Sequence, residues 1–573
     1  MNPIKRIQYL RSLFTAEKIR GYIIPSTDEY QSEYTSHYAR RLEYITGFTG
    51  SNGVALVLED KLLFFTDGRY KAQAGRELSL GWEIFDLREL RDISPQGEIG
   101  YDPMLFTEVS ISLYSHLNLR LVEPNLVDTI WEDKPPRPSS AIYDYPLEYA
   151  GVCGEDKIAA CRDEMRKHNA SYCLLTASDS ICWLLNIRAS DIEFCPLLLS
   201  YLLIGLDKLW IFTEKREWNA LLQNNEFQIC NSHDIRGFLQ NLSAQNHSGK
   251  VMLDKATCPI GLSSLIKNPV YSTDPCILPK ACKNNIEIKH SADVHTRDGV
   301  ALCETIAWIY DALEQNKTIT EYDIGLCLSR ERQKQQGYIS DSFPAIVGYQ
   351  GNGAIIHYRA SKPTAKTIQG SGLLLIDSGG HYFGGTTDVT RVIAIGKPSI
   401  EQKQRYTEVL KGHISLAKQK FPSGTTGGAL DILARQYLWQ NGLDYAHGTG
   451  HGVGNALSVH EGPQRIGQQN LVQMQKGMII SNEPGYYKDD EYGIRIENLM
   501  ALQDEGEKFL KFDTLSLAPY CSDLIILNML SAEELEWLED YYSKIRIMLN
   551  DKLSPSAQKV LERELKLAQF IVD

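Results

Sequence analysis

The segments Leu373-Leu-Leu-Ile-Asp-Ser-Gly-Gly380 and Gly384-Gly-Thr-Thr-Asp-Val-Thr-Arg391 decide the expected fold of the C-terminal half of the chain. The first is an apolar strand that ends in Asp377, and the second begins a strand around Asp388. Ten residues with four glycines separate the two acids, as in a hairpin loop. If the strands pair, both carboxylates reach one point, where two like charges require a cation or a shared proton. Asp beside Gly is also common turn chemistry, so this pair alone does not define a metal site.

A histidine segment lies further along the chain. His447-Gly-Thr-Gly-His-Gly-Val-Gly454 has four glycines in eight positions, so its backbone can approach a ligand closely while two imidazoles lie near each other. His460 follows nine residues after His451. A flexible glycine loop with incidental histidines is the alternative interpretation of this segment alone.

Two glutamates follow in strand-like surroundings. Glu483, in Ser481-Asn-Glu-Pro-Gly485, is expected at the end of a strand before a Pro-Gly turn. Glu497 is expected on a strand, where the alternation of side chains places it on the same face as Arg495. Either glutamate alone is more often a solvated surface residue.

Together these segments provide four carboxylates and one imidazole. Such an oxygen-rich set suits Mn²⁺, Co²⁺ or Zn²⁺ rather than a thiolate-bound structural zinc. Two divalent ions about 3.5–4 Å apart can share a water, make hydroxide from it near neutral pH and hold a scissile carbonyl. We therefore expect hydrolysis at a dinuclear site whose ligands are Asp377, Asp388, His451, Glu483 and Glu497.

The rest of the chain indicates three parts. Pro-rich segments at 134–138 and 275–279 divide the 573 residues into 1–150, 151–283 and 284–573. Residues 44–51 (YITGFTGS) resemble 183–190 (WLLNIRAS), and 60–67 (DKLLFFTD) resemble 207–214 (DKLWIFTE). Two blocks that agree in order predict two related α/β domains in tandem.

The third part has its own pattern. Leu302, Ile306, Ile309 and Leu313 fall on one face of an expected helix, and strand-like runs surround the candidate ligands. We expect a mixed α/β domain with a largely antiparallel, curved sheet. The stretch 531–573 is expected to be a helical extension that docks on this domain.

Composition and charge exclude several classes of protein. A formal net charge of −13 without a basic block argues against a nucleic-acid partner. The longest apolar run, 194–206, is far shorter than the roughly 20 residues that a membrane-spanning helix needs. The N-terminus lacks the organisation of a secretory signal, and the 12 cysteines include no Cys-x-x-Cys pair. These features predict a cytoplasmic protein with reduced thiols and no membrane partner.

With these motifs the chain resembles the pita-bread metallopeptidases of family M24, and within them the three-domain, cytosolic-type aminopeptidase P. The resemblance covers nearly the whole chain. It includes 42–51 (LEYITGFTGS), 66–70 (TDGRY), 130–138 (IWEDKPPRP) and the five ligand segments. It implies two tandem α/β domains like the N-terminal domains of creatinase and prolidase, followed by a pita-bread α+β catalytic domain.

The resemblance also implies a metal-dependent X-Pro aminopeptidase with two divalent ions, Mn²⁺ before Co²⁺ or Zn²⁺. Asp388 and Glu497 look like bridging ligands, Asp377 like a ligand of one ion, and His451 with Glu483 like ligands of the other. A hydroxide that bridges the ions is the implied nucleophile, and Glu483 the implied proton relay. The implied substrate-side residues are His357, His447, His460 and Arg495.

Substrate and assembly follow from the same resemblance. An X-Pro bond has a tertiary amide without N–H and a fixed ring, so a pocket shaped for that ring accepts what most peptidases reject. The resemblance implies short peptides with proline at the second position, and a homodimer. Trp439 matches a family position at the dimer contact, although it is equally compatible with a buried helix end.

Two rival interpretations stay open. Prolidases share the five ligands but usually have one N-terminal domain, which the tandem repeat argues against. A binding or scaffold protein could keep the fold without catalysis. Such relatives lose ligand residues, whereas this chain has all five.

Overall fold

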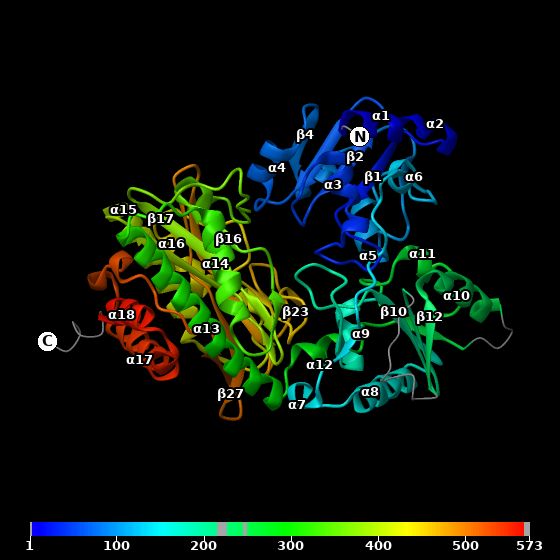
Figure 1. Cartoon of the computed structure of the whole chain (residues 1–573). Coiled ribbons are helices and arrows are strands. Elements are labelled where there is room, and N and C mark those ends of the chain that lie inside the picture. Colours follow the sequence, from blue (N-terminus) through cyan, green and yellow to red (C-terminus); the bar gives the residue numbers. More distant parts are fainter. Residues whose placement is uncertain (1–2, 215–225, 245–248, 567–573) are drawn as a thin grey trace. The chain divides into compact units, whose positions relative to one another are not determined.

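The structure is a computed structural model that describes residues 3–214, 226–244 and 249–566 (Figure 1). These form two compact units. The N-terminal unit comprises Met1–Leu147 and Val152–Ile277, and the C-terminal unit comprises Glu148–Gly151 and Leu278–Asp573. The finer division at 150 and 283 stays a prediction.

The N-terminal unit contains two six-stranded sheets with the same topology. Their strand orders are β4-β3-β2-β1-β5-β6 and β12-β11-β10-β8-β13-β14. In both sheets the central hairpins are antiparallel and the outer strands join in parallel. The strands of the first sheet are β1 (Gly21–Pro25), β2 (Val54–Leu58), β3 (Leu62–Thr66), β4 (Trp82–Asp86), β5 (Ile99–Tyr101) and β6 (Leu119–Leu121). Those of the second are β8 (Tyr172–Leu175), β10 (Ser200–Gly205), β11 (Leu209–Thr213), β12 (Phe227–Asn231), β13 (Val251–Leu253) and β14 (Pro269–Tyr271).

This shared topology confirms the tandem repeat. The block 60–67 contains β3 and the block 207–214 contains β11, which occupies the same place in the second sheet. The blocks 44–51 and 183–190 each begin in the last turn of equivalent helices, α3 (Arg41–Thr46) and α9 (Ser178–Leu185). Matching sequence blocks therefore lie at matching positions in two related α/β domains.

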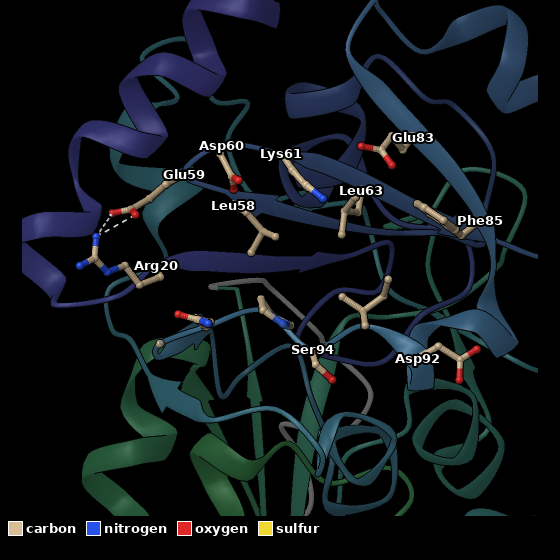
Figure 2. A pocket seen from close by; sticks show the side chains of 14 residues that line it. Arg20, Leu58, Glu59, Asp60, Lys61, Leu63, Glu83, Phe85, Asp92 and Ser94 are labelled. Atoms are coloured by element: carbon tan, nitrogen blue, oxygen red, sulfur yellow. Dashed lines mark hydrogen bonds and ion pairs between the residues drawn. The ribbon is translucent and has the colours of Figure 1, made fainter.

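A cavity of about 920 Å³ opens on the first sheet (Figure 2). Leu58, Leu63 and Phe85 line it beside acidic side chains, and Arg20 binds both oxygens of Glu59 at its edge. None of the predicted site residues is among those that line it. All the predicted site residues belong to the C-terminal unit.

The C-terminal unit contains the long helix α13 (Asn285–Glu314). A capping box formed by Asn284 and Glu287 starts it. Its predicted apolar face packs in a core with β17 (Gly372–Ser378) and β20 (Val389–Ile395). Leu302, Ile306 and Ile309 are buried there, and Leu313 is partly buried.

The strands of this unit form antiparallel sheets. One has the order β16-β17-β20 and another the order β21-β28-β27-β24-β22-β23, and every registered pair in them is antiparallel. This confirms the predicted antiparallel arrangement. The additional strands are β16 (Ile346–Tyr349), β21 (Lys420–Pro422), β22 (Gly450–Gly452), β23 (Glu461–Ile466), β24 (Ile479–Asn482), β27 (Asn498–Glu505) and β28 (Phe509–Thr514).

Helices complete the C-terminal unit. In Figure 1 the red helices α17 (Ala532–Leu549) and α18 (Pro555–Glu564) lie beside α13, and α17 buries Leu538 and Tyr542. The expected extension therefore docks on this unit, although 567–573 lie outside the described residues. Helix α16 (Gly427–Trp439) ends in Trp439, which is 41% exposed and so does not bury the helix end.

Two further expectations concern the whole chain. All twelve cysteines are free in the structure, and their reduced state stays a prediction. Among the described residues, none of the helices has both the length and the apolar character needed to cross a membrane.

Candidate metal centre

Strand pairing brings the first two candidate ligands together. Strands β17 and β20 are antiparallel, with Asp377 opposite Thr390, and Asp388 directly precedes β20. The connection is itself a short hairpin, β18 (Gly380–Tyr382) and β19 (Gly385–Thr386). The predicted pairing is therefore confirmed, and both carboxylates are buried.

Three candidate ligands form one cluster. One ligand atom each from Asp388, His451 and Glu497 lie within 4.8 Å of one another. Nε2 of His451 is 3.5 Å from Oδ2 of Asp388 and 3.5 Å from Oε1 of Glu483. Nδ1 of His451 lies 3.0 Å from the Gly452 carbonyl, so it carries the proton and Nε2 faces the carboxylates.

The local backbone explains why His451 lies so close to the glutamates. It sits in the middle of β22, and a Cβ added at Gly450 would overlap the Ser481 carbonyl. The hydroxyl of Ser481 accepts from the His451 amide at 2.9 Å and donates to Oε1 of Glu483 at 3.1 Å. Glycine in the histidine segment thus permits close contact with β24, at whose end Glu483 stands.

Asp377 is connected to the cluster through Arg495. Nη2 of Arg495 donates to Oδ2 of Asp377 at 2.5 Å, and its Nε donates to the Thr390 hydroxyl at 3.3 Å. That hydroxyl donates to Oε2 of Glu497 at 2.7 Å. All five predicted ligands are therefore linked by direct contacts or through Arg495 and Thr390.

The prediction that Glu497 lies on a strand was wrong. It lies in a two-residue break between β26 (Tyr492–Arg495) and β27. Its amide donates to the Thr390 carbonyl at 3.2 Å, and its carbonyl accepts from Nη1 of Arg391 at 2.7 Å. Because β20 satisfies both backbone groups, the chain can leave one hairpin and join another sheet at this point.

The electrostatics of the cluster favour a cation. Burial, with repulsion from neighbouring carboxylates, raises the pKa of Asp388 and of Glu497 well above the ordinary range. Burial also raises the pKa of Asp377, although Arg495 opposes it. Oδ1 of Asp377 and Oδ1 of Asp388 are buried without a hydrogen-bond partner. Buried acceptors that repel one another and lack donors fit bound divalent ions.

Two of the predicted substrate-side histidines, His447 and His460, lie beside this centre. The rings of His451 and His460 meet edge to face with centroids 4.4 Å apart. Nε2 of His447 is 2.8 Å from the Tyr487 hydroxyl, and burial lowers the pKa of His447 to about 4. His357 follows the carbonyl of Ile356, which accepts from Arg495 at 3.4 Å.

Tyr487 is a site residue that the sequence argument missed. Its hydroxyl accepts from Nη1 of Arg495 at 2.8 Å and contacts His447, so it joins the two. Strand β25 (Gly485–Lys488) pairs with β26, with Gly485 opposite Arg495. Gly485 and Tyr487 share a face, so a hairpin centred on Asp490 would have placed Tyr487 diagonally beside Arg495.

Comparison with known protein families matches most of the chain. The model of metallopeptidase family M24 matches residues 290–504, and a C-terminal region of that family matches 508–567. Two models of the creatinase/prolidase N-terminal domain match 6–128 and 133–287.

Relatives and solved structures agree with these matches. Xaa-Pro aminopeptidase 1 of Dictyostelium discoideum is 36% identical over 97% of this chain and 94% of its own length. Aminopeptidase P2 of Arabidopsis thaliana is 34% identical over 96% of this chain and 86% of its own length.

The crystal structure of X-prolyl aminopeptidase from Caenorhabditis elegans, described as a cytosolic enzyme with a di-nuclear active site, has a TM-score of 0.94 and 31% identity. It covers 99% of this chain and 100% of its own. Prolidase from Pyrococcus horikoshii shares only the fold, with a TM-score of 0.51 and 22% identity over 64% of this chain and 99% of its own. The chain belongs to the Xaa-Pro aminopeptidase family of M24 metallopeptidases.

Proposed function

We propose that this chain hydrolyses the first peptide bond of short peptides whose second residue is proline, in the cytoplasm, at a site that holds two divalent ions. The observation that carries the proposal is the cluster of Asp388, His451 and Glu497 in a chain with two tandem N-terminal domains. Full-length similarity to relatives named Xaa-Pro aminopeptidases supports the same activity. The di-nuclear centre of the Caenorhabditis elegans enzyme supports the number of metal ions.

The proposed ligand roles follow the resemblance to aminopeptidase P. Asp388 and Glu497 would hold both ions, Asp377 would hold one, and His451 with Glu483 would hold the other. When bound, the ions would lower the pKa of a water shared between them, which supplies hydroxide, and would polarise the scissile carbonyl. We propose Mn²⁺, although Co²⁺ and Zn²⁺ suit the same oxygen-rich set.

The surrounding side chains bind and orient the peptide. Burial lowers the pKa of His447 to about 4, and its Nδ1 donates to the Gly448 carbonyl at 2.8 Å, so its Nε2 accepts from the Tyr487 hydroxyl. Arg495 fixes Tyr487, which fixes His447, and this series holds the substrate side of the centre. Glu483, which lies 3.5 Å from His451, would move a proton between the attacking water and the leaving amine.

The decisive experiment is release of the N-terminal residue from Arg-Pro-Pro by the purified protein, with added Mn²⁺ and in parallel with a chelator. We expect free arginine only in the sample with metal. Cleavage of the dipeptide Gly-Pro alone would identify a prolidase instead. No cleavage of either peptide by metal-loaded protein would favour a scaffold.

Substitution of the substrate-side histidines separates them from the ligands. His357→Ala and His460→Ala should each lower kcat about 100-fold, because such groups stabilise charge that develops in the transition state. Both variants should keep two metal ions, measured by elemental analysis of dialysed protein. Loss of an ion from either variant would place that histidine among the ligands.

We also propose a homodimer. Trp439 is exposed at the end of α16, and large aromatic side chains are enriched at protein interfaces. Light scattering of the purified protein tests this assembly, with Trp439→Ala expected to weaken it.

A further inference from the structure

An ion triad lies buried beside the candidate centre. Oε2 of Glu461 is 2.8 Å from Nζ of Lys280, and Oε1 of Glu461 is 2.5 Å from Nζ of Lys283. The side chains are 0%, 3% and 1% exposed, in the order Glu461, Lys280 and Lys283. Each carboxylate oxygen therefore binds a different ammonium group, and all three residues belong to the C-terminal unit.

The two lysines lie in the segment with which that unit resumes after Ile277. The C-terminal unit resumes at Leu278, and Lys280 lies in the short helix α12 (Ile277–Ala281). The amide of Lys283 donates to the Gly477 carbonyl at 2.9 Å, and Cys282 forms an isolated antiparallel bridge with Met478. This segment thus lies against the start of β24, whose end positions Glu483.

Glu461 connects the same segment to the histidines. It directly follows His460 and begins β23, where it is registered opposite Gly452 of β22. A Cβ added at Gly454 would lie 3.2 Å from Oε2 of Glu461, so the carboxylate lies against the histidine segment. The His460 ring contacts the His451 ring edge to face, and His460 is the residue directly before Glu461.

Stability alone does not account for such a triad. Burying three charges has a large desolvation cost, and apolar side chains of similar volume often stabilise a protein as well or better. A fully hydrogen-bonded carboxylate does, however, define one backbone position where an apolar contact would allow several. His460, the neighbouring residue, needs such a fixed position to meet a peptide at the centre.

We propose that Glu461, held by Lys280 and Lys283, is a positioning residue that fixes the His460 imidazole at the metal centre. The triad acts through His460 and does not touch the substrate. This inference rests on the proposed function, because His460 is assigned there to the substrate side of the site.

The test is Glu461→Gln, alone and combined with His460→Ala, assayed on Arg-Pro-Pro with saturating Mn²⁺. The single variant should lower kcat about 10- to 100-fold, as the loss of a supporting contact around a metal site typically does. Its KM should change less than about threefold, and two metal ions should remain bound. In the His460→Ala background, Glu461→Gln should change kcat less than about twofold, because residues that act as a unit are not additive.

Matched variants separate positioning from stability. Glu534→Gln removes a carboxylate of similar burial, 2.6 Å from Lys411, and should leave kcat unchanged even if it lowers Tm. Lys283→Arg should retain activity because it keeps the charge, whereas Lys283→Met should behave like Glu461→Gln. If Glu461→Gln does not fold, the two Lys283 variants decide the question by the same readouts.

The outcomes are distinct from those that test the proposed function. Inactive wild-type protein on Arg-Pro-Pro would reject the activity itself. If the wild type is active, three results would each overturn this inference alone. They are a normal kcat in Glu461→Gln, loss of metal from that variant, and a loss of kcat on adding Glu461→Gln to His460→Ala that equals its loss in the wild-type background.

Discussion

Replacement of Asp388 by alanine should lower the rate of Arg-Pro-Pro hydrolysis about a thousandfold or more. It should also remove both metal ions together. Oδ2 of Asp388 faces His451, while its buried Oδ1 has no hydrogen-bond partner. Two oxygens of one carboxylate can therefore serve two ions. Glu497→Ala should give the same result, because Glu497 belongs to the same cluster.

Metal content and turnover have to be measured on the same preparation. Elemental analysis after dialysis should give two ions per chain for the wild type and close to none for Asp388→Ala. The matched control is Asp504→Ala, since Asp504 pairs with Lys476 at a site where both side chains are about half exposed. Normal turnover of Asp388→Ala with a single ion bound would contradict the bridging role.

The sequence could predict the cluster of Asp388, His451 and Glu497 because each residue lies in a short segment rich in glycine or turn residues. Asp377 and Asp388 flank a glycine-rich hairpin, and the structure pairs β17 and β20 on either side of it. The tandem domains were predictable for a similar reason, because each repeated block coincides with one helix end or one strand. In the Asp377–Asp388 hairpin and in the repeated blocks, the sequence motif and the helix or strand that it predicts occupy the same residues.

The supporting residues were not predictable because their partners are remote in sequence. Lys280 and Glu461 are 181 residues apart, and Thr390 and Glu497 are 107 apart. Neither pair has a periodicity or motif that connects its members. The break at Glu497 depends on Arg391, a buried guanidinium that also binds the Ala518 carbonyl and the Tyr541 hydroxyl. Such contacts become visible only once the sheets are assembled.

Bound metal should stabilise the protein more at about pH 7.5 than at about pH 5.5. Burial raises the folded-state pKa of Asp388 and of Glu497, so the metal-free fold retains protons that the unfolded chain has already lost. The stability that these protons contribute is complete below the ordinary carboxyl pKa and is lost as pH rises toward the folded-state pKa. Divalent ions replace the protons, and protons compete with metal in acid.

Thermal unfolding with Mn²⁺ and with chelator, at both pH values, measures the effect. A free metal concentration a hundred times Kd adds about 2.7 kcal/mol, which corresponds to roughly 2–4 °C for a protein of this size. Exposed groups do not contribute to this gain in Tm, because they titrate alike in the metal-bound and metal-free forms. Glu505 is an example, with a pKa lowered to about 2 by Lys420 and Lys511. Asp388→Ala should show little gain at either pH. A gain in the wild type that is equal at both pH values, or larger in acid, would mean that metal does not replace protons on these carboxylates, and the ligand assignment would then have to be abandoned.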